Sequence, residues 1–463
     1  MRKIILKFFI LISLSLSIGL GSHAWGLNLH QSLSLAIFFV SILGTLFFWE
    51  FRLSFAFLGT SLLLITRAID IDNLIKFSSL EIILFLVGMM VLIGLLKEAG
   101  MFAWVMQVIL RIPRLTSKKF LVAVTLISAF LACAIDEVTS ILFVVAAVLE
   151  ICDYFEVNPV PFVITAVLAT NIGSAGTVLG NPIGILIAVK SGLGFEDFLI
   201  RAFPLVCFSL LILIAVLLFW YRKALAELDI KIKEFGDNPI LRRLISVPME
   251  KRLKVCLGIF IVTLIFIALH YRLELLLGLE KNTILLIVPL VSSGLVMIWK
   301  WKKARSYIEK DVEWWTLLFF LLLFAQAGTL NYTGTTDFLA EKFIGIFGKN
   351  TNVLTGFILW VSALGSSVLD NVVLVAAFIP VLESFKEIGF AVNPLWWALL
   401  FGGCFGGNIT LVGSTANIVA LGVLEKERKI RIGFLQWLGI GLTSSLIILI
   451  VVWVSLLWLP LYR

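Results

Sequence analysis

Charged residues are scarce in this sequence, since Asp, Glu, Lys and Arg make up only 14% of its 463 residues. Soluble globular domains carry about 25%. Together with 61% hydrophobic residues and a mean hydropathy of +1.09, this scarcity excludes an ordinary soluble domain. The net charge of +8 does not indicate nucleic-acid binding, because the basic residues lie in loops between apolar stretches. We therefore predict a polytopic membrane protein that binds no nucleic acid.

Histidine and cysteine are also rare. The three histidines (His23, His30 and His270) lie at the ends of apolar stretches, which argues against a histidine base or proton relay within the membrane. The five cysteines are odd in number and scattered, which argues against a disulfide framework or a metal knot. We therefore predict that the chain is not an enzyme and needs no cofactor. The serine in GSAG (173–176) leaves an intramembrane hydrolase as a distant alternative.

Apolar stretches long enough to cross a bilayer recur along the chain. They lie near residues 4–20, 31–49, 53–69, 80–96, 199–220, 254–270, 283–299, 314–330 and 434–459. Two more complicated apolar regions cover 120–190 and 353–424. The expected fold is all-α, with about 11 transmembrane segments. Residues 1–24 are either a first transmembrane helix or a signal peptide, because a basic start and an apolar run precede Ala24.

The distribution of basic residues predicts the topology. They concentrate at 111–119, 222–254, 300–310 and 426–431, whereas the intervening loops hold few. Cytoplasmic loops of membrane proteins are enriched in Lys and Arg. We expect residues 221–253, with Gly236 and Pro239, to form a cytoplasmic linker in a multi-pass protein of the plasma (inner) membrane.

The linker separates two halves that repeat each other. Asp136 of AIDEVTS (134–140) matches Asp370 of LDNVV (369–373), and TVLG (177–180) matches TLVG (410–413), at an offset of 233–235 residues. Landmarks kept in order at one offset indicate a true repeat. The loop charges make the matching spans run in opposite directions. The sequence therefore predicts two inverted repeats, residues 25–220 and 254–463, as in secondary transporters.

Each repeat contains one region with charges at its centre and one with helix breakers at its centre. A straight helix would place Asp136 and Glu137 in lipid at a cost of several kcal/mol. Re-entrant hairpins at 120–150 and 353–383 avoid that cost, with Asp136 and Glu137 at one tip and Asp370 and Asn371 at the other. The regions 159–190 and 394–424 are expected to be helices broken near the midplane, which expose unpaired backbone groups to a solute.

The candidate ion- and substrate-binding residues are the polar and glycine residues of these tips and breaks. They are Asp136, Glu137, Thr139, Asn171, Thr177, Gly180, Asn181, Asp370, Asn371, Asn408, Thr410, Gly413, Ser414, Thr415 and Asn417. Sodium is expected near Asn181 and Asn417. The competing interpretation is structural: carboxylates and amides also cap helices, and glycines also permit close helix packing. Capping and ion binding are compatible.

These motifs resemble those of the ion transporter superfamily. Within it they are similar to the group of arsenite permeases and sodium/proton antiporters (ArsB/NhaD-like), with a citrate-transporter-like domain, whose repeats carry an Asp-Asn tip and a Thr-x-x-Gly-(Asp/Ser)-x-x-Asn break. The second repeat matches this pattern. The first departs from it, with Glu137 at the tip and with GNPIG (180–184) where the group has Gly-Asp-Pro-Pro-Asn. The resemblance implies a scaffold and a mobile transport domain that moves like an elevator, often in a homodimer.

We therefore predict a secondary active transporter coupled to a proton or sodium gradient. Three carboxylates and no lysine or arginine lie in the predicted core, so its charge favours cations over free divalent anions. Sodium, arsenite or a small anion carried with a cation are the expected cargoes. A sodium-coupled carboxylate or anion symporter is the alternative, although the Ser-Asn-Thr tips of dicarboxylate carriers are lacking. A passive channel is a more distant one.

Overall fold

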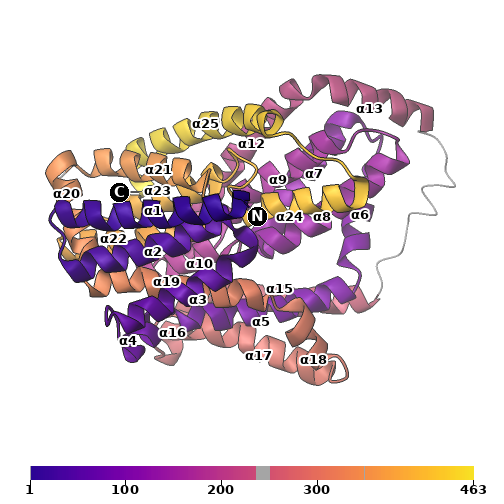
Figure 1. Cartoon of the computed structure of the whole chain (residues 1–463). Coiled ribbons are helices and arrows are strands. Elements are labelled where there is room, and N and C mark those ends of the chain that lie inside the picture. Colours follow the sequence, from indigo (N-terminus) through magenta and orange to yellow (C-terminus); the bar gives the residue numbers. More distant parts are fainter. Residues whose placement is uncertain (1, 236–250, 349, 463) are drawn as a thin grey trace.

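A computed structural model describes residues 2–235, 251–348 and 350–462, and these residues form helices and no strand (Figure 1). The first series of helices is α1 (Arg2–Ala24), α2 (Leu29–Phe47), α3 (Arg52–Ile65), α4 (Ile71–Phe77), α5 (Leu80–Glu98), α6 (Met101–Leu110), α7 (Ser117–Ala134), α8 (Glu137–Tyr154), α9 (Val160–Gly173), α10 (Pro182–Ser191), α11 (Phe195–Asp197), α12 (Phe203–Trp220) and, within the linker, α13 (Arg222–Phe235).

A second series of helices follows. It comprises α15 (Lys251–Ala268), α16 (His270–Leu277), α17 (Thr283–Trp299), α18 (Ala304–Ser306), α19 (Trp314–Tyr332), α20 (Thr335–Phe347), α21 (Thr351–Ser366), α22 (Asn371–Glu387), α23 (Asn393–Gly406), α24 (Thr415–Arg428) and α25 (Phe434–Trp458). Short 3₁₀ turns are η1 (Trp49–Phe51), η2 (Ser174–Gly176) and η5 (Pro460–Tyr462), and π-helical turns are η3 (Phe198–Ala202) and η4 (Tyr307–Asp311).

Seven of the described helices are long and apolar enough to cross a membrane, or eight if the bent pair α15 and α16 counts as one span. Four shorter apolar helical segments, at 160–176, 182–191, 283–299 and 351–366, fall below that length. Three of these four belong to the regions predicted as hairpin arms or broken helices. The predicted total of about 11 transmembrane segments is thus reached only when the four shorter apolar segments are counted together with the seven or eight full-length spans. The chain is an integral, multi-pass membrane protein.

Six consecutive helices in the second series each begin 233 or 234 residues after a counterpart in the first. The paired helices are α5 and α19, α6 and α20, α7 and α21, α8 and α22, α9 and α23, and α10 and α24. Figure 1 places α6 toward the end of the molecule that carries α13 and α18, and α20 toward the end that carries α4. We call these the α13 end and the α4 end. The repeated helices are therefore inverted with respect to each other.

Glycine with positive φ marks the same joint in both repeats. Gly100 separates α5 from α6 at a φ of 92°, and Gly334 separates α19 from α20 at 72°. Only glycine adopts this left-handed backbone readily. A sequence match between the repeats therefore corresponds to a conformational requirement shared by both.

In each repeat the first arm of the hairpin packs directly on the first half of the broken helix. A Cβ atom added at Gly173 of α9 would meet the backbone of Ala129 in α7, and one at Gly406 of α23 would meet the backbone of Ala363 in α21. Small residues at such positions let helix backbones approach closely in membranes. The hairpin and the broken helix of each repeat are therefore tightly packed together.

The two segments outside the repeated helices have simple placements. Residues 2–24 form α1, which packs on α2, and the choice between a retained helix and a signal peptide stays open. Of the predicted linker, 222–235 form α13, whose Asp229 accepts a hydrogen bond at 2.8 Å from the backbone N–H of Ser117, the first residue of α7. Residues 236–250, with Gly236 and Pro239, lie outside the described residues.

Candidate functional site

Four helices begin at the hairpin tips and helix breaks, and each is capped by a polar side chain at its N-terminus. Asp136 caps α8, accepting from the N–H groups of Val138 (2.8 Å) and Thr139 (2.9 Å). The other caps are Asp370 on α22, Asn181 on α10 and Ser414 on α24. These residue types are the preferred N-caps. The capping interpretation therefore holds for these four residues, and it explains why the chain turns where it does.

The carboxylates at the two tips are satisfied to different degrees. Asp370 accepts from the Val372 N–H (3.1 Å) through Oδ1 and from the Thr415 hydroxyl (2.6 Å) through Oδ2. Asp136 uses only Oδ1, and its buried Oδ2 has no hydrogen-bond partner among the described residues. The first tip therefore has an unused acceptor that the second lacks.

Glu137 and Asn371 meet where the two repeats face each other. They occupy equivalent positions, each directly after the capping aspartate, and the Asn371 amide donates to Glu137 Oε1 at 3.3 Å. Glu137 is 2% exposed, and Oε2 has no hydrogen-bond partner within the described part of the chain. A buried carboxylate without a cationic partner is costly, and ionisable groups of this kind inside membranes are candidates for ion sites.

The helix breaks are fastened to the hairpins by a matching pair of threonines. The Thr177 hydroxyl donates to the carbonyl of Cys133 at the end of α7, and the Thr410 hydroxyl donates to the carbonyl of Ser367 after α21. Gly180 and Gly413 sit where a Cβ atom would meet neighbouring backbone. These four predicted residues thus shape and anchor the breaks.

A buried amide network joins the two breaks. Asn171 of α9 donates to Asn408 (2.7 Å) and Asn417 (2.8 Å) and accepts from Ser414 (3.0 Å). Asn417 in turn donates to two backbone carbonyls of its own break, those of Gly407 and Thr410, each at 2.8 Å. Asn171, Asn408 and Asn417 are therefore brought together, as predicted for the core, but as partners of one another.

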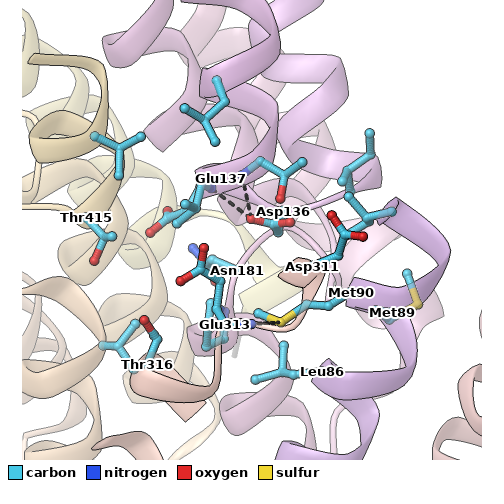
Figure 2. A pocket seen from close by; sticks show the side chains of 18 of the residues that line it. Leu86, Met89, Met90, Asp136, Glu137, Asn181, Asp311, Glu313, Thr316 and Thr415 are labelled. Carbon is cyan, nitrogen blue, oxygen red and sulfur yellow. Dashed lines mark hydrogen bonds between the residues drawn. The ribbon is translucent and has the colours of Figure 1, made fainter. Parts of the chain in front are cut away.

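A cavity of about 260 Å³ lies beside the first hairpin tip. Five predicted residues line it: Asp136, Glu137, Thr139, Asn181 and Thr415. Figure 2 shows the labelled side chains of Asp136, Glu137 and Asn181 on one side of this space and those of Asp311, Glu313 and Thr316 on another. One wall comes from α8, α10 and α24, and the other from α3, α5, η4 and α19. The other ten predicted residues do not line this cavity.

The prediction that no lysine or arginine lies in the core is wrong for this cavity. Arg52, Lys97 and Lys310 line it alongside four carboxylates. Arg52 at the start of α3 is only 6% exposed; it donates to the Thr316 hydroxyl (2.9 Å) and stacks on the Trp49 ring (4.1 Å). Its Nε has no hydrogen-bond partner in the described residues. The cavity therefore offers a donor for an anion as well as acceptors for a cation.

Arg52, Asp311 and Glu313 were missed because they lie outside the hairpins and breaks. One signal was present: Glu50 and Arg52 stand between two apolar stretches, 31–49 and 53–69, that leave almost no room for a loop. Asp311 and Glu313 directly follow the basic segment 300–310, whose charges predict the topology. Asp311 forms an ion pair with Lys97 at 3.5 Å, and the charges of Glu313 and Asp370 act on Arg52.

No group of three or more His, Cys, Asp or Glu side chains that could hold a metal ion occurs in the described residues. At the predicted sodium positions, the Asn181 amide donates to Ser174 Oγ (2.9 Å) and Cys404 Sγ (3.1 Å), and its oxygen caps α10. The carbonyls beside Asn417 already accept hydrogen bonds from its amide. Among the described residues that line the cavity, the buried side-chain oxygen atoms without a hydrogen-bond partner are Asp136 Oδ2 and Glu137 Oε2.

Comparison with solved structures identifies the same fold elsewhere. The chain superimposes on the crystal structure of the YdaH transporter of Alcanivorax borkumensis, described as having an unusual topology, with a TM-score of 0.52 and 16% sequence identity. The match covers 85% of this chain and 88% of that one. The predicted fold class, an all-α membrane protein of two inverted repeats with hairpins and broken helices, is confirmed.

Sequence comparison finds transporters. An uncharacterized transporter of Mycobacterium bovis is 31% identical over 349 residues, which are 75% of this chain and 78% of that protein. The human P protein is 27% identical, over 77% of this chain and 51% of its own length. The family model described as citrate transporter (CitMHS) matches residues 37–402. The resemblance to the ion transporter superfamily is thus confirmed, and the chain belongs to the citrate transporter family.

Proposed function

We propose that the protein is a secondary active transporter in which Glu137 carries the coupling ion, a proton or sodium. The observation that supports this proposal is the position of the carboxylate. It is buried, it lines the cavity, and Asn371 donates to its Oε1, while Oε2 has no hydrogen-bond partner among the described residues. Ionisable groups placed inside a membrane without a pairing partner mark ion pathways. No further cofactor is needed for such coupling, and no catalytic role is assigned to any residue.

The proposed cargo is a small inorganic ion or solute, such as arsenite, sodium or a small anion. A cavity of about 260 Å³ is small compared with typical ligand pockets of about 300–1,000 Å³. Sodium, where it is the coupling ion, would use the free oxygens of Asp136 and Glu137, with Asn181 and Asn417 holding the surrounding backbone in place.

Arg52 favours a second candidate, sodium- or proton-coupled symport of a carboxylate. A guanidinium with an unpartnered Nε is suited to a carboxylate, and the family is described by the word citrate. The four carboxylates of the cavity would repel a free multivalent anion, so an accompanying cation is required.

We propose elevator-type movement of the hairpins and broken helices against the remaining helices. The two walls of the cavity belong to these two sets, α8, α10 and α24 on one side and α3, α5 and α19 on the other. In this proposal the protein lies in the plasma (inner) membrane, with residues 221–253 in the cytoplasm and with a homodimer formed through the non-moving helices.

Transport by the purified full chain in proteoliposomes tests this function. An imposed pH or sodium gradient should drive flux of at least one of sodium, arsenite, phosphate or citrate, and Glu137→Gln should remove the gradient-driven component. Glu425→Gln is the matched control, because Glu425 lies at the far end of α24 in an exposed ion pair with Arg431. Unchanged gradient-driven flux in Glu137→Gln would overturn the assignment, and flux independent of any gradient would indicate a channel.

A further inference from the structure

A second, smaller cavity of about 110 Å³ lies toward the α4 end of the molecule. One wall comes from the end of α4, Ser79 and the last turns of α19, and the other wall comes from α10 and α22. The first cavity lies toward the opposite end, since its Lys97 and Asp311 adjoin the ion pairs that Glu98 makes with Arg252 and Lys303. Figure 1 shows α4 and α18 at opposite ends.

The two cavities are lined by equivalent positions of the two repeats. Shifting residues of the first cavity by the repeat offset of 233 or 234 yields residues of the second. In α5 and α19 the equivalent residues are Met90 and Phe324, Ile93 and Ala327, Gly94 and Gly328, and Lys97 and Asn331. In α8 and α22 they are Leu142 and Ala376. A shift in the opposite direction pairs Asp311 with Phe77, Glu313 with Ser79, and Val419 with Leu186. Each repeat thus builds the same cavity once.

We infer that the second cavity is the vestibule through which the solute reaches the transport site in the alternate conformation, from the membrane side opposite to the first cavity. This inference rests on the proposed transport function. Inverted repeats exchange their conformations when a transporter switches sides. In this inference the larger first cavity is the vestibule of the present state, and the smaller second one enlarges in the alternate state.

The chemistry of the two cavities differs although their positions match. The charges Lys97, Asp311 and Glu313 of the first are replaced in the second by Asn331, Phe77 and Ser79. The second cavity instead has Lys190 at the end of α10 and Glu383 near the end of α22, which interact electrostatically. The charged groups thus lie on both walls of the first cavity but only on the moving wall of the second.

Ser79 supplies an independent sign that the second cavity receives a polar ligand. It is 1% exposed, and its hydroxyl lacks a hydrogen-bond partner in the described residues. Its φ of 49° places it in the left-handed region, which non-glycine residues seldom adopt. A buried hydroxyl without a partner is unfavourable unless something bonds to it part of the time. The cavity presents charged groups of both signs, Lys190 and Glu383, so its lining fits a small polar solute such as a hydrated ion or an ion pair.

Cysteine labelling of matched positions tests the assignment. Leu142→Cys of the first cavity is compared with its equivalent Ala376→Cys of the second, in the full chain reconstituted into proteoliposomes. A membrane-impermeant maleimide is added to one side at a time. Ile93→Cys and Ala327→Cys form a second matched pair in case one variant fails to fold. Ala166→Cys, fully buried in α9 and in neither cavity, is the negative control, with the exposed Cys207 replaced by serine throughout.

Without a gradient, Leu142→Cys should label about tenfold or more faster than Ala376→Cys, as expected when the alternate state is a minor population. The two should label from opposite sides. A gradient that drives the exchange should raise the rate for Ala376→Cys and lower it for Leu142→Cys.

Labelling of Ala376→Cys and Ala327→Cys from the same side as their partners would overturn the inference, as would failure of both to label while coupled flux proceeds. The matched cysteines could also label from opposite sides in a protein that moves no solute of the panel. That result would support the assignment of the second cavity as a vestibule and would count against the proposed transport function.

Discussion

In the first repeat the residue that follows the capping aspartate is Glu137, and in the second it is Asn371. The backbone around them is the same: each is the first residue of the second hairpin arm, and each faces the other repeat. The difference therefore lies in the side chain, which is a longer carboxylate in the first repeat and a shorter amide in the second. Two glutamates at this distance would repel, whereas a glutamate beside an amide donor keeps one carboxylate oxygen free for an ion.

The helix breaks show the same division of roles. Asn171 of the first repeat is equivalent to Cys404 of the second, and Asn181 is equivalent to Ser414. Asn171 bonds to Ser414, and Asn181 bonds to Cys404, so each bond is the inverted image of the other. The first repeat supplies the amides of both bonds and the second supplies a hydroxyl and a thiol. In these two bonds the geometry is shared and the amides belong to the first repeat, whereas the network's other two amides, Asn408 and Asn417, belong to the second.

The largest effect is expected from neutralising Glu137. Glu137→Gln keeps the size of the side chain and its bond from Asn371 but removes the charge, so gradient-driven flux should fall to background and its pH dependence should disappear. Proteoliposome flux at several pH values measures both.

Asp370→Asn makes the corresponding change at the second tip. Because both Asp370 oxygens already accept hydrogen bonds within the protein, we expect this variant to retain a part of the gradient-driven flux. Equal loss in the two variants would remove the functional distinction between the tips.

Removal of the central amide should lower stability strongly. In Asn171→Ala the side-chain oxygens of Asn408 and Asn417 lose a donor and the Ser414 hydroxyl loses its acceptor. Each buried group left unpaired lowers the free energy of unfolding by about 1–3 kcal/mol. Cys404→Ala, its counterpart, should cost less because the bond to sulfur is weak. Thermal unfolding in detergent compares them, and a larger loss for Cys404→Ala would contradict the proposed division.

The helix contacts that the repeats share should respond alike. Gly173→Ala and Gly406→Ala each place a methyl group against the backbone of a hairpin arm, which should destabilise the protein by about 1–3 kcal/mol. Gly422→Ala, where a Cβ meets nothing within 4 Å, is the neutral control for the same assay. A clear difference between the first two variants would mean that only one hairpin is tightly packed.

The smallest effect is expected at the ion pair between Arg428 of α24 and Asp153 of α8, which joins the repeats outside the apolar region. Its hydrogen bond to Asp153 raises the pKa of the Arg428 guanidinium above its ordinary value, so the charge is permanent. Because both side chains are accessible to solvent, Arg428→Gln should cost less than about 1 kcal/mol. The midpoint of thermal unfolding should also change less with added salt in this variant than in the parent chain.

Local signals explain what could be predicted from the sequence. Asp136, Asp370, Asn181 and Ser414 are N-cap residues next to apolar runs, and such residues determine where helices begin regardless of the rest of the fold. The hairpin tips and breaks could therefore be found along the chain. The repeat offset then indicated that the two sets of elements belong together.

Contacts between distant segments explain what could not be predicted. Arg52 reaches the cavity only because α3 packs beside α19, where Thr316 accepts its hydrogen bond from 264 residues further along the chain. Asn171 meets Asn417 because the two breaks lie in contact. Neither arrangement leaves a local pattern in the sequence. The basic residues that line the cavity were therefore not predicted.

The facing pair of Glu137 and Asn371 also has an evolutionary consequence. A transporter assembled from two separate copies of one repeat would have to place the same side chain twice at this position, giving either two acids or none. Once the two repeats have separate sequences, mutation can alter one copy without the other. A single carboxylate at this position is therefore available to a transporter whose repeats differ in sequence.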